Sequence, residues 1–127
     1  MRPKLKDHLR SRYANVKKPV VDGHRFDSQH EANRYGELKL MLAYGQIESL
    51  KLHPRYPIKI GGITVLMRSK GYPNGRKLTY VADFSYVDLV LEEVVIEDVK
   101  MQSGHRTEVY KIKRALMEAM GYRITEV

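Results

Sequence analysis

Apolar side chains recur at helical spacing in a segment that begins at Ser28. Ser28 and Glu31 match a capping box, in which the first residue of a helix pairs with one three residues later. Tyr35, Leu38 and Leu42 follow on one helical face. We therefore predict a helix that runs to about residue 44, with Glu31 at the head of its buried stripe. Helix capping is one role for Glu31, metal binding is another, and the two are compatible.

A second amphipathic helix is predicted after Thr107, whose hydroxyl can cap its first turn. Its expected apolar face is formed by Val109, Ile112, Leu116 and Met120. A short strand over residues 123–127 then closes the chain. The order of helix, strands, helix and strand predicts an α/β fold, with a central mixed sheet flanked by helices.

Strand patterns fill the region between the two helices, and a small hairpin over residues 19–26 precedes the first helix. The expected strands are residues 50–60, bent or confined to an edge by two prolines, then 63–67, 78–87 and 94–100. Residues 68–77 are rich in Gly, Pro and Asn and in basic side chains, which indicates a loop.

Charged residues gather on the last two predicted strands. Asp98 and Lys100 are two residues apart and share a strand face with Val94 and Ile96, which we expect to be buried. With the turn centred between residues 90 and 91, Asp83, near the middle of its strand, lies directly opposite Asp98. Because this turn has no Gly, Asn or Pro, its length stays open, and an odd length would move Asp83 to the other face.

Two facing carboxylates predict a bound cation. Their Cβ atoms would be roughly 5 Å apart, where two negative charges repel and one carboxylate takes up a proton. Hard divalent cations favour clustered carboxylate oxygens and remove that repulsion. We therefore predict a metal site at Asp83 and Asp98, with Glu31 as a third candidate ligand and Lys100 as a partner for phosphate. The alternative is a strand end whose charges are solvated.

The composition limits the class of protein and the cellular compartment that fit this chain. The 127 residues are 43% apolar, which suits a globular domain, and contain no apolar run of 18 residues. We expect neither a membrane span nor a signal peptide. The absence of cysteine excludes disulfides and thiolate zinc sites, and favours a reducing cytoplasm. The five histidines show no metal-binding spacing and are interpreted as structural or surface groups: His8, His24, His30, His53 and His105. Only His105, close to the site in sequence, keeps a possible catalytic or phosphate-contacting role.

A net charge of +8 indicates a polyanionic partner, most often nucleic acid. Improved solubility is the alternative explanation. We expect a flexible basic arm over residues 1–18 and a single domain over residues 19–127. The candidate DNA-binding residues are Arg10, Arg12, Lys17, Lys18, Lys70, Arg76, Lys77, Lys111, Lys113 and Arg114.

Three stretches of the chain, taken in order, carry a family resemblance. They are residues 26–35, 80–86, and 97–100 followed by 107–116, within a region covering residues 19–127. The chain resembles the PD-(D/E)XK nuclease superfamily, and most nearly a small phage-encoded family of unassigned function in its Holliday-junction-resolvase-like branch. Ala82 stands where the family name has proline, a position that varies widely in the superfamily.

The resemblance implies an αβββαβ, restriction-endonuclease-like core and Mg²⁺-dependent cleavage of DNA, with Mn²⁺ as a substitute cofactor. Asp83 and Asp98 would bind the metal, Lys100 would be the motif lysine, and Glu31 the helix-borne acid. We therefore expect a DNA endonuclease, with branched DNA and recombination intermediates among its candidate substrates, and a homodimer by analogy. The alternatives are a non-catalytic DNA-binding accessory protein with the same fold and a structural phage protein.

Overall fold

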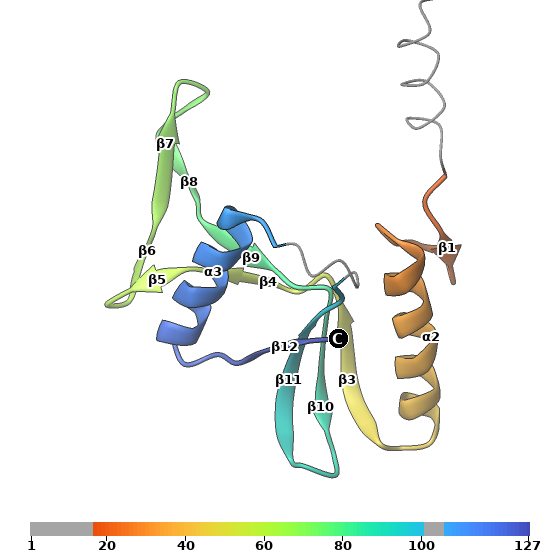
Figure 1. The fold of residues 1–127 in the computed structure, drawn as a ribbon. Coiled ribbons are helices and arrows are strands. Elements are labelled where there is room, and N and C mark those ends of the chain that lie inside the picture. The colour runs from red at the N-terminus through yellow and green to blue at the C-terminus, as the bar shows by residue number, and fades with distance from the viewer. Residues whose placement is uncertain (1–16, 101–105) are drawn as a thin grey trace, which may run out of the picture.

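The computed structural model describes residues 17–100 and 106–127, which form a mixed four-stranded sheet with two helices and several hairpins (Figure 1). The elements are β1 (Val20–Val21), β2 (His24–Arg25), α2 (Gln29–Ala43), β3 (Ile47–Leu52), β4 (Arg55–Pro57), β5 (Lys59–Ile60), β6 (Ile63–Thr64), β7 (Leu66–Ser69), β8 (Tyr72–Lys77), β9 (Thr79–Val81), β10 (Phe84–Asp88), β11 (Glu93–Asp98), α3 (Glu108–Ala119) and β12 (Ile124–Glu126). No helix in these ranges is long and apolar enough to cross a bilayer.

The strands of the main sheet lie in the order β12-β11-β10-β3. β11 and β12 are parallel, and the other neighbouring pairs are antiparallel, so the sheet is mixed as predicted. Along the chain, the two helices and the sheet strands follow the order α2, β3, β10, β11, α3, β12. β4 to β9 form an excursion between the first and second of these strands. The predicted strand 50–60 is therefore three strands, β3, β4 and β5.

The first predicted helix is confirmed as α2, which packs beside the sheet (Figure 1). The hydroxyl Oγ of Ser28 accepts a hydrogen bond from the backbone N–H of Glu31 at 3.1 Å, and Gly45 takes a positive φ of 72° after the last turn. One core cluster joins this helix to the sheet: Phe26, Ala32, Tyr35, Leu38, Ile47, Phe84 and Tyr86. Leu42, predicted on the buried face, is exposed because it lies beyond this cluster.

The second predicted helix is confirmed as α3, and its buried face agrees with the prediction in part, since Leu116 and Met120 pack against the second core cluster. Val109 and Ile112 are exposed, whereas Met117 is fully buried. Tyr110 lies two turns before Met117 on the same side and packs against the second core cluster. The ring of Tyr110 adds contact area to this face. Because its hydroxyl makes the side chain partly polar, a search for apolar residues at helical spacing leaves it out. The cluster consists of Ile58, Tyr80, Ala82, Ile96, Met117 and Ile124.

The predicted register of the β10–β11 hairpin is confirmed. Phe84 pairs with Glu97 and Asp88 with Glu93, so the turn is centred between residues 90 and 91. Two details are wrong. Asp83 lies at the bend between β9 and β10 rather than inside one strand, because β9 pairs with β4 while β10 pairs with β3 and β11. Val94 is exposed, since β12 reaches only the far end of β11 and leaves the turn end uncovered.

The loop predicted over residues 68–77 is also wrong, because it forms most of the β7–β8 hairpin. The hairpin extends away from the main sheet (Figure 1). Its β7 side chains are all exposed, so it lacks the apolar alternation that identifies a strand in the sequence. Gly75 lies in β8 with a positive φ of 87°, and a Cβ there would approach the Cβ of Leu66 to 2.9 Å. The glycine that indicated a loop instead permits close strand pairing.

Candidate metal centre

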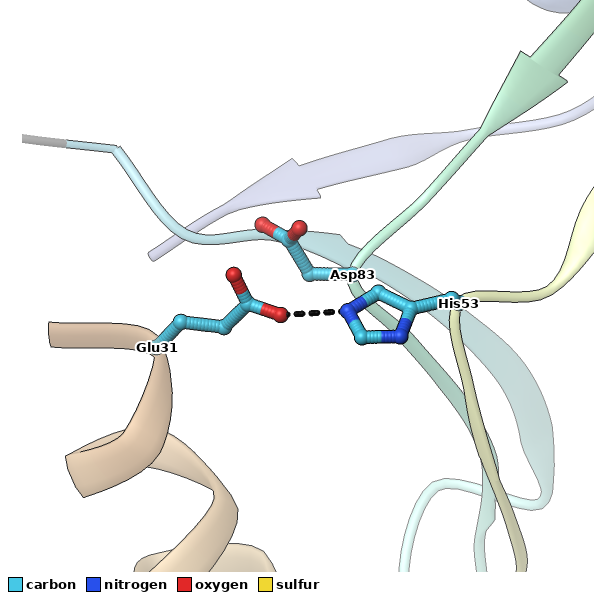
Figure 2. Close-up of side chains that lie close together, drawn as sticks. All are labelled: Glu31, His53 and Asp83. Carbon is cyan, nitrogen blue, oxygen red and sulfur yellow. Dashed lines mark hydrogen bonds and ion pairs between the residues drawn. The ribbon is translucent and has the colours of Figure 1, made fainter. Parts of the chain in front are cut away.

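Glu31, His53 and Asp83 each present a ligand atom within 4.8 Å of the others (Figure 2). Glu31 comes from the first turn of α2, His53 follows β3, and Asp83 occupies the bend before β10. Nε2 of His53 lies 2.6 Å from Oε1 of Glu31. Two carboxylates and one imidazole form a mixed oxygen and nitrogen donor set of the kind that binds divalent cations.

Backbone hydrogen bonds fix the two ends of the excursion at this centre. The N–H of His53 donates to the carbonyl of Asp83 at 2.9 Å, and the N–H of Ala82 donates to the carbonyl of Pro54 at 3.1 Å. His53 has a φ of 51°, in the left-handed region that costs free energy for a residue with a Cβ. The bend that places its imidazole beside Glu31 is therefore held by pairing with the segment that carries Asp83.

The carboxylates are held from their other sides by backbone N–H groups. Oδ2 of Asp83 accepts a hydrogen bond from the N–H of Val99 at 2.7 Å. Oε2 of Glu31 accepts from the N–H of Asp27 at 3.4 Å, one residue before the Ser28 cap that a capping box would use. The Glu31 carboxylate thus faces His53 more than it caps its own helix.

Burial leaves the negative charge at this centre poorly compensated. Glu31 is only 3% exposed, and its burial raises the pKa of its carboxyl, against the bond with His53, which lowers it. Burial likewise raises the pKa of Asp83, against the Val99 N–H and the positive charge of Lys100. A raised carboxyl pKa means that the ionised form needs a further positive partner. A divalent cation between the three side chains would supply it, so the residues fit a metal ion.

Asp98 lies outside this group of three ligand atoms, although the hairpin register places it across from Asp83. Asp98 is 4% exposed, and burial raises its pKa to about 6. Its Oδ2 is buried and has no hydrogen-bond partner in the part of the chain that the structure describes. A buried carboxylate oxygen without a partner is costly, and a cation or a proton would relieve that cost. Asp98 is therefore a further buried acid, across from Asp83, and one of its oxygens lacks a partner among the described residues.

Lys100 stands near both aspartates without being bound to either. Its positive charge lowers the pKa of Asp83 and of Asp98. Its Nζ lies 3.6 Å from the centroid of the Tyr110 ring, and among the described residues it makes no ion pair. A ring face holds an ammonium group more weakly than a carboxylate does, so Lys100 keeps donors for an anion.

A buried ion pair that the sequence analysis missed links the two elements bearing the acids. Arg34 of α2 donates from Nε and Nη2 to the two oxygens of Glu97, at 2.9 and 2.7 Å. Tyr86 also donates its hydroxyl to Glu97, which is only 1% exposed. The two parallel bonds fix the helix that carries Glu31 against the strand that carries Asp98.

The predicted DNA-binding cations fall into distinct groups. Arg10 and Arg12 lie outside the described residues, as do His8 and His105. Lys18 pairs with Asp27, Lys111 with Glu108, and Arg114 with Glu118 and Glu126. Within the described ranges, no ion pair is made by Lys17, Lys70, Arg76, Lys77 or Lys113. These five keep their charge available for a partner.

Comparison with known proteins gives one match. The model of a family described as "Protein of unknown function (DUF1064)" matches residues 10–126. No curated protein matches the chain, and no solved structure matches it.

Proposed function

We propose that this chain, a member of the DUF1064 family of unknown function, catalyses metal-dependent endonucleolytic cleavage of DNA in a reducing cytoplasm. The observation that carries the proposal is the convergence of Glu31, His53 and Asp83 from three distant segments. Carboxylates with raised pKa values beside an unpaired lysine suit a cation and a phosphate together.

The resemblance to PD-(D/E)XK nucleases supports the same activity. The helices and sheet strands have the order α, β, β, β, α, β that the resemblance implies. Asp83, Asp98 and Lys100, which the resemblance assigns to the reaction, lie at one end of the β10–β11 pair. His53 is an addition to that assignment and comes from the structure alone.

Different residues of the site have different roles in the proposed reaction. Glu31, His53 and Asp83 would hold the cation. Bound there, a divalent cation would supply a positive charge for a phosphate oxygen and would lower the pKa of a water molecule. Carboxylates suit Mg²⁺ and Mn²⁺ alike, whereas an imidazole nitrogen favours transition metals, so we propose Mn²⁺ as well as Mg²⁺.

Lys100 and Asp98 complete the proposed site. The ammonium of Lys100 is a compact charge with three donors, which suits it to orient a phosphate or a water molecule. The Asp98 carboxyl has a pKa of about 6, so it exchanges a proton close to neutral pH. Asp98 would either join the cation or accept a proton from water beside it.

A cleavage assay tests the proposal. Linear, nicked and branched DNA are incubated with the full chain and Mg²⁺ or Mn²⁺, and strand scission is measured. We expect cleavage that requires the metal, and Glu31→Gln and Asp83→Asn should each abolish it. Glu48→Gln, at an exposed glutamate of β3, is the matched control and should cut at the wild-type rate. DNA binding without scission by any form of the chain would overturn the proposal in favour of the accessory protein.

A further inference from the structure

A cationic recess lies at the base of the β7–β8 hairpin, apart from the metal centre. Its volume is about 290 Å³. Its lining consists of Arg55, Met67, Arg76, Lys77, Thr79, Val81 and Lys113. Four of the seven side chains are cations, contributed by β4, β8 and α3, and none of the seven is acidic.

The cations of the recess lack the acidic partners that neighbouring cations have. Arg55, Arg76, Lys77 and Lys113 make no ion pair within the described ranges, and the guanidinium of Arg76 lies over the ring of Tyr72, 5.3 Å from its centroid. By contrast, Lys111 and Arg114, on the same helix as Lys113, are both paired with glutamates. Like charges gathered without a counter-charge repel, and a bound anion removes that repulsion.

The recess is joined to the metal centre by a strand pair. Arg55 of β4 pairs with Val81 of β9. Both residues are close to the centre in the chain: Arg55 comes two residues after His53, and Val81 comes two residues before Asp83. Two residues of chain span at most about 7 Å, which is of the order of the spacing between successive phosphates along one DNA strand. An anion in the recess would therefore lie one or two nucleotides from a phosphate at the centre.

We propose that this recess binds an internal backbone phosphate of the DNA strand whose neighbouring phosphate occupies the metal centre. The inference rests on the proposed function for the identity of the polyanion. Arg55 supplies a planar fork that can bind two phosphate oxygens, and the lysines supply point charges. Met67 and Val81 form an apolar part of the lining against which a sugar can pack.

Salt-dependent binding to a short duplex tests the recess. Affinity is measured by fluorescence anisotropy in EDTA, so that neither metal binding nor cleavage contributes. The variants are Arg55→Gln, Lys113→Gln and the double variant. Each lost phosphate contact should make the slope of log K against log salt shallower by about 0.9. If both cations hold one phosphate, each single variant should keep part of that contact and lose less than this slope. The double variant should lose the most slope and the most affinity.

Matched control variants distinguish the effect of the recess on DNA binding from the effect of a lower net charge. Arg123→Gln and Lys59→Gln also remove one charge each, from exposed positions outside the recess. We expect both to keep the wild-type slope. Equal loss of slope in the controls, or an unchanged slope in the double variant, would overturn the inference. Thermal unfolding of every variant checks that the fold is intact, which we expect because neither Arg55 nor Lys113 makes an ion pair in the described chain.

A second comparison distinguishes an internal phosphate from a terminal one. Duplexes with and without 5′-phosphates should bind equally, and the recess variants should weaken both to the same extent. Loss of the variant effect on removal of the 5′-phosphates would overturn the inference and assign the recess to a strand end. Because these measurements use no metal, a chain that binds in this way but never cuts would contradict the proposed function and leave the recess assignment standing.

Discussion

Nε2 of His53 lies 2.6 Å from Oε1 of Glu31, although 22 residues separate the two in the chain. The contact joins the residue after β3 to the first turn of α2. Its two atoms, an imidazole nitrogen and a carboxylate oxygen, are of types that commonly bind divalent metals in proteins. Asp83 lies beside them with its own ligand atom. The contact therefore brings two potential donor atoms together, and metal binding by them can be distinguished by experiment from helix capping and from structural support.

The first prediction concerns metal binding by the apo protein. His53→Ala should weaken Mn²⁺ binding about tenfold or more, because even indirect partners of a metal ligand contribute that much. The effect on Mg²⁺ should be smaller, since Mg²⁺ prefers oxygen donors. Titration calorimetry measures both affinities. His30→Ala, at an exposed histidine next to Glu31 in the chain, is the control. Equal Mn²⁺ affinity in all three proteins would remove His53 from the centre.

The second prediction separates capping from metal binding at the start of α2. Ser28→Ala removes the side chain that accepts the Glu31 N–H and should cost about 1 kcal/mol of stability, without changing metal affinity. Glu31→Gln should change stability little, because it removes a buried charge whose pKa burial raises, while metal binding falls. Urea unfolding and metal titration are measured on both variants. A Glu31→Gln protein that lost stability and kept its metal affinity would leave only the capping role.

The third prediction concerns pH and Asp98. Its pKa is about 6 in the folded chain, against an ordinary value of 3.8, so the folded state binds a proton more tightly than the unfolded state. Stability from this group is therefore present below about pH 4 and is lost as pH rises through 6. The loss is on the order of 2–3 kcal/mol.

Asp98→Asn should remove this dependence. In EDTA, the variant should match the wild type near pH 4 and be more stable than it at pH 7.5, as measured by urea unfolding at both values. A variant that is less stable than the wild type at pH 7.5 would show that the carboxylate is stabilised in its charged form.

The fourth prediction concerns the buried pair of Arg34 and Glu97. Arg34→Met leaves a carboxylate that is 1% exposed without its cation, and should cost about 3–5 kcal/mol. Replacing the whole group, with Arg34→Met, Glu97→Leu and Tyr86→Phe together, should restore most of that stability because no charge is then buried. Urea unfolding gives both values. A triple variant as unstable as the single one would assign the loss to packing instead.

The sequence was sufficient for the elements whose patterns are local. The cap at Ser28 and the apolar positions Tyr35 and Leu38 predict α2, and the observed helix follows them. The β10–β11 register was predictable because the residues that pair lie close in the chain, on either side of one turn. Local spacing carried this information, and the same spacing placed Asp83 opposite Asp98.

His53 could not be found in the same way. It reaches Glu31 and Asp83 only because β3 pairs with β10 and the chain bends at the end of β3, and both depend on contacts between distant segments. The ion pair of Arg34 with Glu97 has the same origin, since a helix and a strand far apart in the chain meet in the fold. No spacing rule within one element describes such contacts.

The excursion from β4 to β9 leaves the sheet at His53 and returns at Asp83, and these two residues are hydrogen-bonded to each other through their backbones. The inserted segment can therefore be lengthened, shortened or exchanged at its outer hairpin without moving the donor atoms. Each doubling of a flexible loop costs only about 0.6 kcal/mol in closure entropy. In design, the outer hairpin can therefore be diversified while the backbone that carries Glu31, His53 and Asp83 stays in place.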